Sequence, residues 1–200
     1  VPMSITSIRE FFSLRSCISK RFGQTWTTNH AIRPQSLFTG VAQRVSILLA
    51  HPASKKNLQW GTRYLRLKAE LRTTFQNLDY AELNTAQKVD GISPKLGTRI
   101  EKAIWDKLMN SQKRIIRFVP RATKHEIFVK DYGETYWIFP FSFKPYLTLV
   151  KSYKQIFFES EQDRDTVFVT ANSSLFYWYY TAISDCWHFG QWHFTTYPIP

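Results

Sequence analysis

Three side chains that commonly bind zinc lie close together near the end of the chain: Cys186, His188 and His193. A structural zinc site needs four ligands, usually arranged as two recognisable pairs. Only three are present here, among bulky aromatic residues, so we predict no metal site. The two cysteines of the chain, Cys17 and Cys186, are far apart in sequence. That spacing argues against a disulfide framework and favours a reducing, cytoplasmic setting.

Four carboxylates also cluster, at Glu159, Glu161, Asp163 and Asp165. A nuclease would use such a cluster, usually with a lysine, to hold a divalent metal ion. These acids directly precede the uncharged segment Thr166–Ser184, however, and acids at a helix N-terminus complement its dipole without any catalytic task. We interpret them as a loop and N-terminal cap. No nucleophile-elbow pattern occurs, and we predict no catalytic residue in the chain.

Basic residues are the most numerous candidates for binding. The chain has 27 Lys and Arg against 15 Asp and Glu, a formal net charge of +12. Such an excess is typical of proteins that bind a polyanion, because each cation placed on a phosphate releases a condensed counterion. Two groups of cations are candidates for DNA contacts: Arg33, Arg44, Lys55, Lys56 and Arg63, and then Lys113, Arg114, Arg117, Arg121 and Lys124. The alternative is an ordinary solvated surface.

Hydrophobic periodicity indicates the elements that would position these residues. Helices are predicted over Ser7–Arg21, Tyr64–Leu78 and Thr166–Ser184. A further helix is indicated by the apolar stripe of Leu96, Ile100, Ile104 and Leu108. Strands are predicted over Val41–Ala50, Leu58–Arg63, Arg114–Val119, Glu126–Lys130, Thr135–Phe139 and Gln155–Phe158. The first two strands would pair as a hairpin, and the polar segment Thr25–Phe38 is predicted to be a loop. Thr166–Ser184 is long enough to cross a bilayer, but its Asn, Ser and Thr residues favour a buried helix, so no membrane contact is expected.

Two segments resemble a known family. The first runs from Arg33-Pro34 through Leu37-Phe38-Thr39-Gly40-Val41-Ala42-Gln43-Arg44-Val45-Ser46-Ile47-Leu48-Leu49 to Gly61-Thr62-Arg63-Tyr64. The second is Asn172-Ser173-Ser174-Leu175-Phe176-Tyr177-Trp178-Tyr179, followed by Ser184-Asp185-Cys186. In this order and separation they resemble the C-terminal half of adenine-specific DNA methyltransferases of bacterial type II restriction–modification systems. That group includes enzymes that fuse methylase and nuclease.

The resemblance implies a mixed α+β fold with two functional parts. Residues 1–78 would be the end of the catalytic domain, a remnant of a Rossmann-like sheet that ends in a β hairpin. Residues 79–200 would be an incomplete α+β target-recognition domain, joined through the polar connection Asp79–Pro94. The implied function is sequence-directed binding of double-stranded DNA, which delivers an adenine to a catalytic centre upstream.

The family's catalytic motifs are missing from this sequence. Members bind S-adenosylmethionine with a glycine-rich loop and hold the target amino group with an Asn-Pro-Pro-Tyr-type tetrapeptide. Here the seven glycines include no pair separated by a single residue, and no Pro-Pro occurs. A loop that approaches a nucleoside needs such glycines. We therefore expect no cofactor in this chain, no methyl transfer by it alone, and a fragment of a longer enzyme, which also fits its opening on Val1.

Base flipping gives a further expectation from the resemblance. A methyltransferase extrudes its target base and packs it against an apolar or aromatic surface. In related enzymes a ring near the hairpin does this, and His51, Trp60 and Tyr64 are the candidates here. Each could instead be an ordinary packing residue.

Three other functions stay open. The chain could be one subunit of a split methyltransferase, completed by a partner that supplies the missing catalytic half. It could be a protein-interaction module whose aromatic tail docks a nuclease or specificity subunit. It could bind single strands or RNA, with a preference over duplex DNA.

Overall fold

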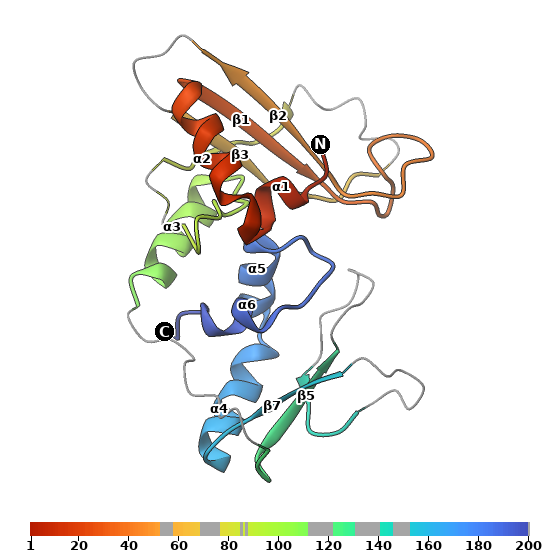
Figure 1. The fold of residues 1–200 in the computed structure, drawn as a ribbon, viewed down its shortest axis with the longest axis vertical. Coiled ribbons are helices and arrows are strands. Elements are labelled where there is room, and N and C mark those ends of the chain that lie inside the picture. The colour runs from red at the N-terminus through yellow and green to blue at the C-terminus, as the bar shows by residue number, and fades with distance from the viewer. Residues whose placement is uncertain are drawn as a thin grey trace. The chain divides into compact units, whose positions relative to one another are not determined.

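The computed structural model describes residues 1–52, 58–68, 77–84, 86, 88–111, 122–130, 141–145 and 153–199 of the 200-residue chain. The chain divides into two compact units, Val1–Asn110 and Ser111–Pro200, coloured red to light green and green to blue (Figure 1). The fold is mixed α+β, which confirms the predicted class. Residues 79–110 belong to the first unit, and the functional boundary at 78 and 79 stays a prediction.

Unit 1 is built on a four-stranded mixed sheet. Its elements are α1 (Ser4–Ser7), the 3-10 helix η1 (Arg9–Phe11), α2 (Phe12–Arg21), β1 (Gln24–His30), β2 (Val45–His51), β3 (Leu58–Leu65), β4 (Ala81–Glu82) and α3 (Arg99–Met109). The strand order is β2-β1-β3-β4. β1 is antiparallel to β2 and parallel to β3, and β4 is antiparallel to β3.

The central strand β1 corrects two predictions. It lies within the segment predicted to be a loop, yet its run Thr25-Trp26-Thr27-Thr28 consists of β-branched and aromatic residues that fit a pleated, half-buried surface. Because β1 lies between β2 and β3, those two strands do not form the predicted hairpin. The antiparallel pair in this sheet is instead β1 with β2, where Gln24 is opposite His51 and His30 is opposite Val45.

The two faces of the sheet differ because side chains alternate along β1. Thr25, Thr27 and Asn29 lie on the face covered by the N-terminal helices, which Figure 1 shows in front of the sheet. Trp26 and His30 alternate with them and lie on the opposite face. The register of the parallel pair places Trp60 beside Trp26.

A buried polar network joins α1 to three strands. The Asn29 side-chain oxygen accepts hydrogen bonds from the Ser46 hydroxyl at 2.9 Å and the Thr6 hydroxyl at 3.2 Å. The Asn29 backbone N–H donates to the Thr62 hydroxyl at 3.2 Å. Asn29, Ser46 and Thr62 are all buried. The residues before α1 continue the sheet, since Pro2 bridges Val45.

The N-terminal helix is more interrupted and more exposed than its sequence predicts. Ser7–Arg21 was expected to be one amphipathic helix with an apolar stripe of Ile8, Phe11, Leu14, Ile18 and Phe22. The structure breaks it into the end of α1, η1 and α2, and α2 has no buried residue. Phe11 and Leu14 are 38% and 43% exposed. The stripe therefore faces solvent in part.

Two further helix predictions differ from the structure. Tyr64 and Leu65 end β3 instead of beginning a helix, and residues 69–76 of that predicted helix lie outside the described residues. The third helix is confirmed as α3, but Ile100 on its predicted stripe is 74% exposed. The face that is buried carries Trp105, Leu108 and Met109, a spacing of three and four residues.

Unit 2 combines a small sheet with three helices. Its elements are β5 (Glu126–Lys130), β6 (Phe141–Ser142), β7 (Tyr153–Phe157), α4 (Glu161–Ala171), α5 (Ser174–Ile183) and α6 (Gln191–Thr195). The sheet is antiparallel with the order β6-β5-β7. β5 is confirmed at its predicted bounds, and β7 begins two residues before its predicted start. The strands predicted at 114–119 and 135–139 lie outside the described residues.

The uncharged segment 166–184 forms two helices instead of one. Ser173 caps α5, because its hydroxyl accepts a hydrogen bond from the Phe176 backbone N–H at 3.1 Å. Asn172, between the two helices, is bonded to β6. Its side-chain oxygen accepts a hydrogen bond from the Phe141 N–H, and its side-chain amide donates one to the Phe141 carbonyl, at 3.1 Å each.

α4 begins at Glu161, so Glu161, Asp163 and Asp165 lie inside the helix and not in a loop before it, which corrects that part of the prediction. Ser160 is the N-terminal cap, and Glu161 and Asp163 lie in the first turn, as expected of acids that complement the helix dipole.

The core of unit 2 is aromatic. The Phe176 ring packs edge-on against Phe141, Phe194 and Tyr197, with centroids 5.8, 5.5 and 5.1 Å away. Phe141 also stacks on Phe194 at 5.4 Å. Such pairs stabilise a core beyond the area they bury. Across the described parts of both units, no helix combines the length and the apolar character needed to cross a bilayer.

Candidate nucleic-acid interface

Arginines gather at one end of the unit 1 sheet. His30, the last residue of β1, pairs with Val45 on one side and Leu65 on the other. Arg44 immediately precedes β2 and Arg66 immediately follows β3, so these two arginines flank β1 just beyond that last row. Arg33 is exposed and follows the end of β1 by three residues. We call Arg33, Arg44, Arg66 and the neighbouring Tyr64 the arginine edge.

Tyr64 contacts two of the arginines of the arginine edge. The Arg44 Nε donates a hydrogen bond to the Tyr64 hydroxyl at 3.2 Å. The Arg66 guanidinium carbon lies 6.0 Å from the centre of the same ring, at the limit of a cation–π contact. Arg44 and Tyr64 are partly exposed and Arg66 is exposed. The ring therefore lies between two cations whose planar forks suit phosphate oxygens.

His30 adds no positive charge to this edge at neutral pH. Its side chain is 1% exposed, and its Nε2 lies 2.8 Å from the Thr28 hydroxyl. Burial lowers the pKa of His30 from 6.5 to about 4, because the charged imidazolium is poorly solvated there. The positive charge at the end of the sheet therefore comes from the arginines.

Arg63, another predicted DNA contact, has a local acidic partner. Its Nε lies 3.8 Å from the Glu101 carboxylate, whose other oxygen accepts hydrogen bonds from the backbone of Gly97 and Thr98. Glu101 and Thr98 form the capping box of α3. The charge of Arg63 is thus partly compensated.

The three predicted base-stacking residues do not converge. His51 is exposed at one end of β2, opposite Gln24, whereas Tyr64 pairs with Asn29 near the other end of β1. Trp60 lies within β3, beside Trp26 of β1. β1, which lies between β2 and β3, also separates the strands that carry His51 and Tyr64.

The other predicted DNA contacts are only partly within the described residues. Lys124 is exposed and lies two residues before β5 of unit 2. The remaining six lie outside the described residues: Lys55, Lys56, Lys113, Arg114, Arg117 and Arg121. Arg66 was not among the predicted DNA contacts, because it fell inside a predicted helix. The alternation of Tyr64, Arg66 and Lys68 at two-residue spacing would have indicated an extended segment.

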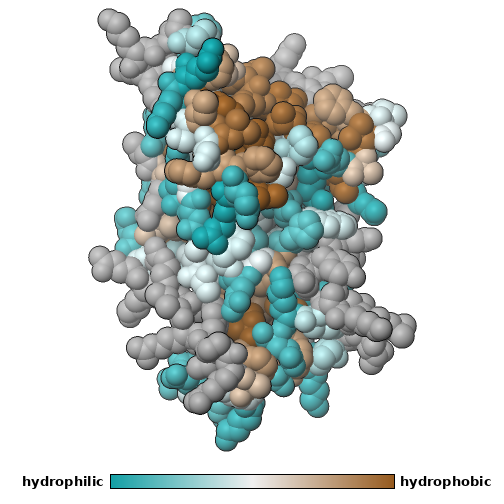
Figure 2. Space-filling model, viewed as in Figure 1, coloured by the Kyte–Doolittle hydropathy of each residue, from teal (hydrophilic) through white to brown (hydrophobic). Residues whose placement is uncertain are grey.

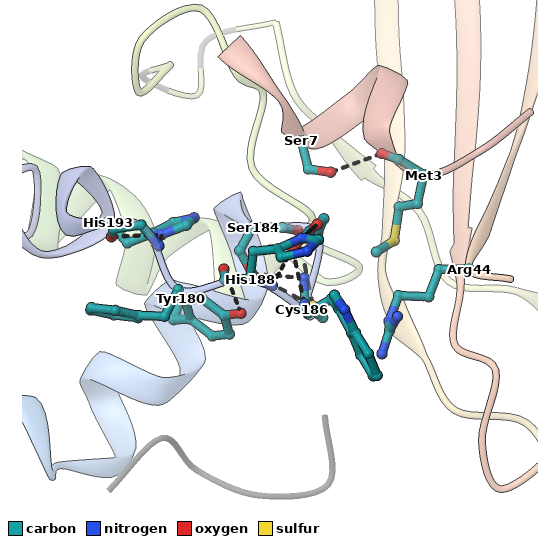
Figure 3. Close-up of polar contacts among 12 residues, drawn as sticks. Met3, Ser7, Arg44, Tyr180, Ser184, Cys186, His188 and His193 are labelled. Carbon is teal, nitrogen blue, oxygen red and sulfur yellow. Dashed lines mark hydrogen bonds and ion pairs between the residues drawn. The ribbon is translucent and has the colours of Figure 1, made fainter. Parts of the chain in front are cut away.

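The three possible zinc ligands of the tail each have a local contact (Figure 3). The buried thiol of Cys186 lies 3.7 Å from the Thr181 carbonyl. His193 is buried and its Nδ1 accepts a hydrogen bond from the Gly190 N–H at 2.9 Å. The Nδ1 of His188 lies 2.7 Å from the Asp185 carboxylate. No group of three metal-binding side chains occurs among the described residues.

Asp185 organises the turn that carries Cys186. Burial would raise the pKa of Asp185, but hydrogen bonds from the backbone and side chain of His188 and from the Trp187 N–H outweigh that effect and hold the pKa below its ordinary value. Cys186 follows with a positive φ of 58°. The Ser-Asp-Cys part of the second family-like segment is therefore a carboxylate-stabilised turn.

Comparison of the chain with protein-family models, with curated proteins and with solved structures gave no significant match.

Proposed function

We propose that this chain binds duplex DNA and serves as the target-recognition part of an adenine-specific DNA methyltransferase. The observation that carries the DNA-binding part of the proposal is the arginine edge, where Arg44 and Arg66 flank Tyr64 at the end of the sheet. The target-recognition part rests on the resemblance, which assigns it to residues 79–200. The formal net charge of +12 and the resemblance of the two quoted segments support the proposal.

The chain's own residues have a limited task in this function. Arg44 and Arg66 bind backbone phosphates, and Tyr64 between them offers a ring to a sugar or base. Such contacts set affinity and register and do not read sequence. S-adenosylmethionine would be bound by the rest of the enzyme, because this sequence lacks the closely spaced glycines that the cofactor needs.

One observation favours a second candidate, a protein-interaction module. Helix α2 exposes Phe12 and Leu14 by 54% and 43%, next to Phe11 at the end of η1. Adjacent exposed apolar side chains are typical of a docking surface. A nuclease or specificity subunit, or the missing catalytic half, would bind there. This candidate predicts salt-insensitive association with protein and no appreciable DNA affinity.

The arginine edge gives a direct test of the DNA-binding proposal. We expect the double variant Arg44→Gln/Arg66→Gln to weaken duplex binding about tenfold or more at low salt. It should also make the slope of log affinity against log salt less steep by about 1.8, since each lost phosphate contact removes about 0.9. Fluorescence anisotropy with a labelled duplex measures both quantities.

Arg164→Gln is the matched control. Arg164 lies in unit 2 and pairs with Glu161 at 2.7 Å and Asp165 at 2.8 Å, so its charge is already compensated. Its variant should bind DNA like the original chain. Equal affinity and salt slope for the double variant and this control would contradict the role of the arginine edge.

A further inference from the structure

Unit 1 contains a cavity of about 340 Å³ between the sheet and the N-terminal helices. Thr25, Thr27 and Asn29 of β1 line its floor, residues from α1 to α2 line its roof, and the segment 88–95 lines one side. This volume lies at the lower end of the range of about 300–1,000 Å³ that small-molecule sites span. It is a separate feature from the arginine edge, none of whose residues lines it.

The roof of the cavity is fixed by polar and close-packed contacts. The Arg15 guanidinium donates hydrogen bonds to the carbonyls of Ile5, Ile8 and Gly91, at 2.9, 2.7 and 3.3 Å. On the other side, the Gln59 amide donates to the Ser19 hydroxyl at 2.6 Å, which ties β3 to α2. A cavity held in this way does not have to be ordered when a ligand enters.

Gly91, in the segment that lines the side of the cavity, allows a close approach to Phe12 of α2. It has a positive φ of 74°, and a Cβ at this position would lie 2.1 Å from the Phe12 ring. The neighbouring Asp90 forms an ion pair with Arg9 at 3.0 Å. The Asp90-Gly91 turn is therefore packed directly against the helical segment that covers the cavity.

The charged side chains that line the cavity are all cations. Arg15, Lys20, Lys88 and Lys95 line it, and no Asp or Glu does so among the described residues. Lys95 is only 4% exposed. Lys20 and Lys88 are exposed and form no ion pair within the described part of the chain. Fixed positive charge beside apolar walls attracts an anion more strongly than it would in water.

Four hydroxyl groups that line the cavity have unused hydrogen-bonding capacity. Thr25 and Thr27 on the floor, Ser16 on the roof and Ser93 on the side make no side-chain hydrogen bond within the described residues. Thr25 is only 6% exposed. Hydroxyl groups that line a cavity next to cations can donate to a ligand there, so this set is suited to an acceptor-rich ligand.

We propose that this cavity binds a small organic phosphate, a phosphate monoester on an apolar or aromatic body. A phosphate monoester carries a charge of about −1.5 to −2 and three strong acceptor oxygens, which match the net positive charge of the lining, the exposed cations Lys20 and Lys88, and the four hydroxyl donors. The remaining lining includes Ile5, Ile18, Leu48, Leu83 and Pro94, which suit an apolar body. Figure 2 shows the surface of unit 1 on this side as a broad apolar area bordered by hydrophilic residues.

The test uses the full chain and adenosine 5′-monophosphate as the probe, with isothermal titration calorimetry at low salt. We expect saturable binding that is weaker by about tenfold or more for adenosine and for inorganic phosphate, because each lacks one half of the ligand. The variant Thr25→Val/Thr27→Val deletes two hydroxyls at nearly constant volume, and Lys88→Met deletes one exposed cation. Each should weaken binding of the nucleotide several-fold. No binding by the original chain would overturn the proposal.

Lys68→Met is the matched control, since Lys68 is an exposed cation of unit 1 outside the cavity lining. It should leave nucleotide binding unchanged, and thermal unfolding establishes that every variant is folded. If Arg44→Gln/Arg66→Gln abolishes nucleotide binding while the cavity variants do not, the nucleotide binds at the arginine edge and the cavity proposal is wrong. If the cavity variants lose the nucleotide but keep DNA affinity, the two sites are separate.

Discussion

A buried histidine of unit 1 couples the stability of the protein to pH. His30 is 1% exposed, and burial lowers its pKa to about 4 against an ordinary value of 6.5. At pH values between about 4 and 6.5, the His30 imidazole is protonated in the unfolded chain but not in the folded chain. The contribution of His30 to stability is therefore complete above about pH 6.5 and is lost as the pH falls toward 4.

His30→Gln tests this coupling. The difference between the two pKa values corresponds to a loss of about 3 kcal/mol of unfolding free energy by pH 4. Urea denaturation at several pH values should show a decline for the original chain, and a decline smaller by that amount for the variant, which has nothing to titrate at position 30. Identical pH dependence in both proteins would show that His30 does not carry the effect.

The buried polar network at Asn29 gives a second prediction for a single residue. Asn29→Ala removes the acceptor used by the buried Ser46 hydroxyl and by Thr6. A buried group left without its partner costs about 1–3 kcal/mol. We expect chemical denaturation to show a loss within this range, because the Ser46 hydroxyl loses its acceptor, whereas the Thr6 hydroxyl keeps its bond to the Met3 carbonyl at 2.8 Å. Ser13→Ala on the exposed face of α2 is the control and should change stability by less than about 0.5 kcal/mol.

Helix α3 depends on its capping box. The Thr98 hydroxyl accepts a hydrogen bond from the Glu101 N–H at 3.1 Å, and the Glu101 carboxylate accepts from the Thr98 N–H at 3.2 Å. Thr98→Ala should cost about 1 kcal/mol of unfolding free energy, and Thr98→Ser, which keeps the acceptor, only a small part of that. Thermal unfolding of both variants measures the difference. A loss as large for serine as for alanine would mean that the methyl group, and not the cap, matters at this position.

The elements could be predicted where local pattern and tertiary context agree. Glu126–Lys130 has three consecutive β-branched or aromatic residues, Ile127, Phe128 and Val129, between charged ends, and it is a strand at its predicted bounds. β1 could not be recognised by polarity, because its polar residues Thr25 and Asn29 are buried in the fold, and the Asn29 side chain accepts a hydrogen bond from Ser46 of β2. The break at Asn172 in the uncharged segment depends on a side-chain bond to β6, far away in sequence.

The candidate site was likewise predictable where residue type and local pattern were enough, and not where it depends on contacts between segments far apart in sequence. Arg33, Arg44 and Tyr64 were identified from residue type and from the family-like segments, and the structure places Arg44 against Tyr64. Arg66 was missed because the end of β3 was assigned to a helix. The cavity could not be foreseen, since its lining comes from segments up to 90 residues apart in sequence, brought together only by the fold of unit 1.

The two compact units have separate cores, which gives a prediction for the whole molecule. Phe176 is central to the aromatic core of unit 2, and Phe176→Ala should cost about 3–5 kcal/mol there. Hydrogen exchange of the α5 backbone amides should accelerate by about a hundredfold or more, because each 1.4 kcal/mol is worth a factor of about ten. The amides of β1 in unit 1 should be unaffected. Equal acceleration in both units would show that the chain unfolds as one cooperative body.

Charge also acts at the scale of the whole chain. A formal net charge of +12 attracts any polyanion, so affinity for DNA alone would not distinguish a recognition module from a basic surface. A preference for duplex over single strands and RNA is the property that separates the proposed function from the single-strand alternative.

The most direct measurement is therefore a titration of the full chain with a labelled DNA duplex at two salt concentrations, about 50 and 200 mM, with single-stranded DNA and RNA as competitors. The proposed function predicts duplex binding that weakens steeply with salt, with a log–log slope of about −2 or steeper, and that neither competitor displaces at equal concentration. A folded chain that does not bind the duplex, or that prefers either competitor, would contradict it.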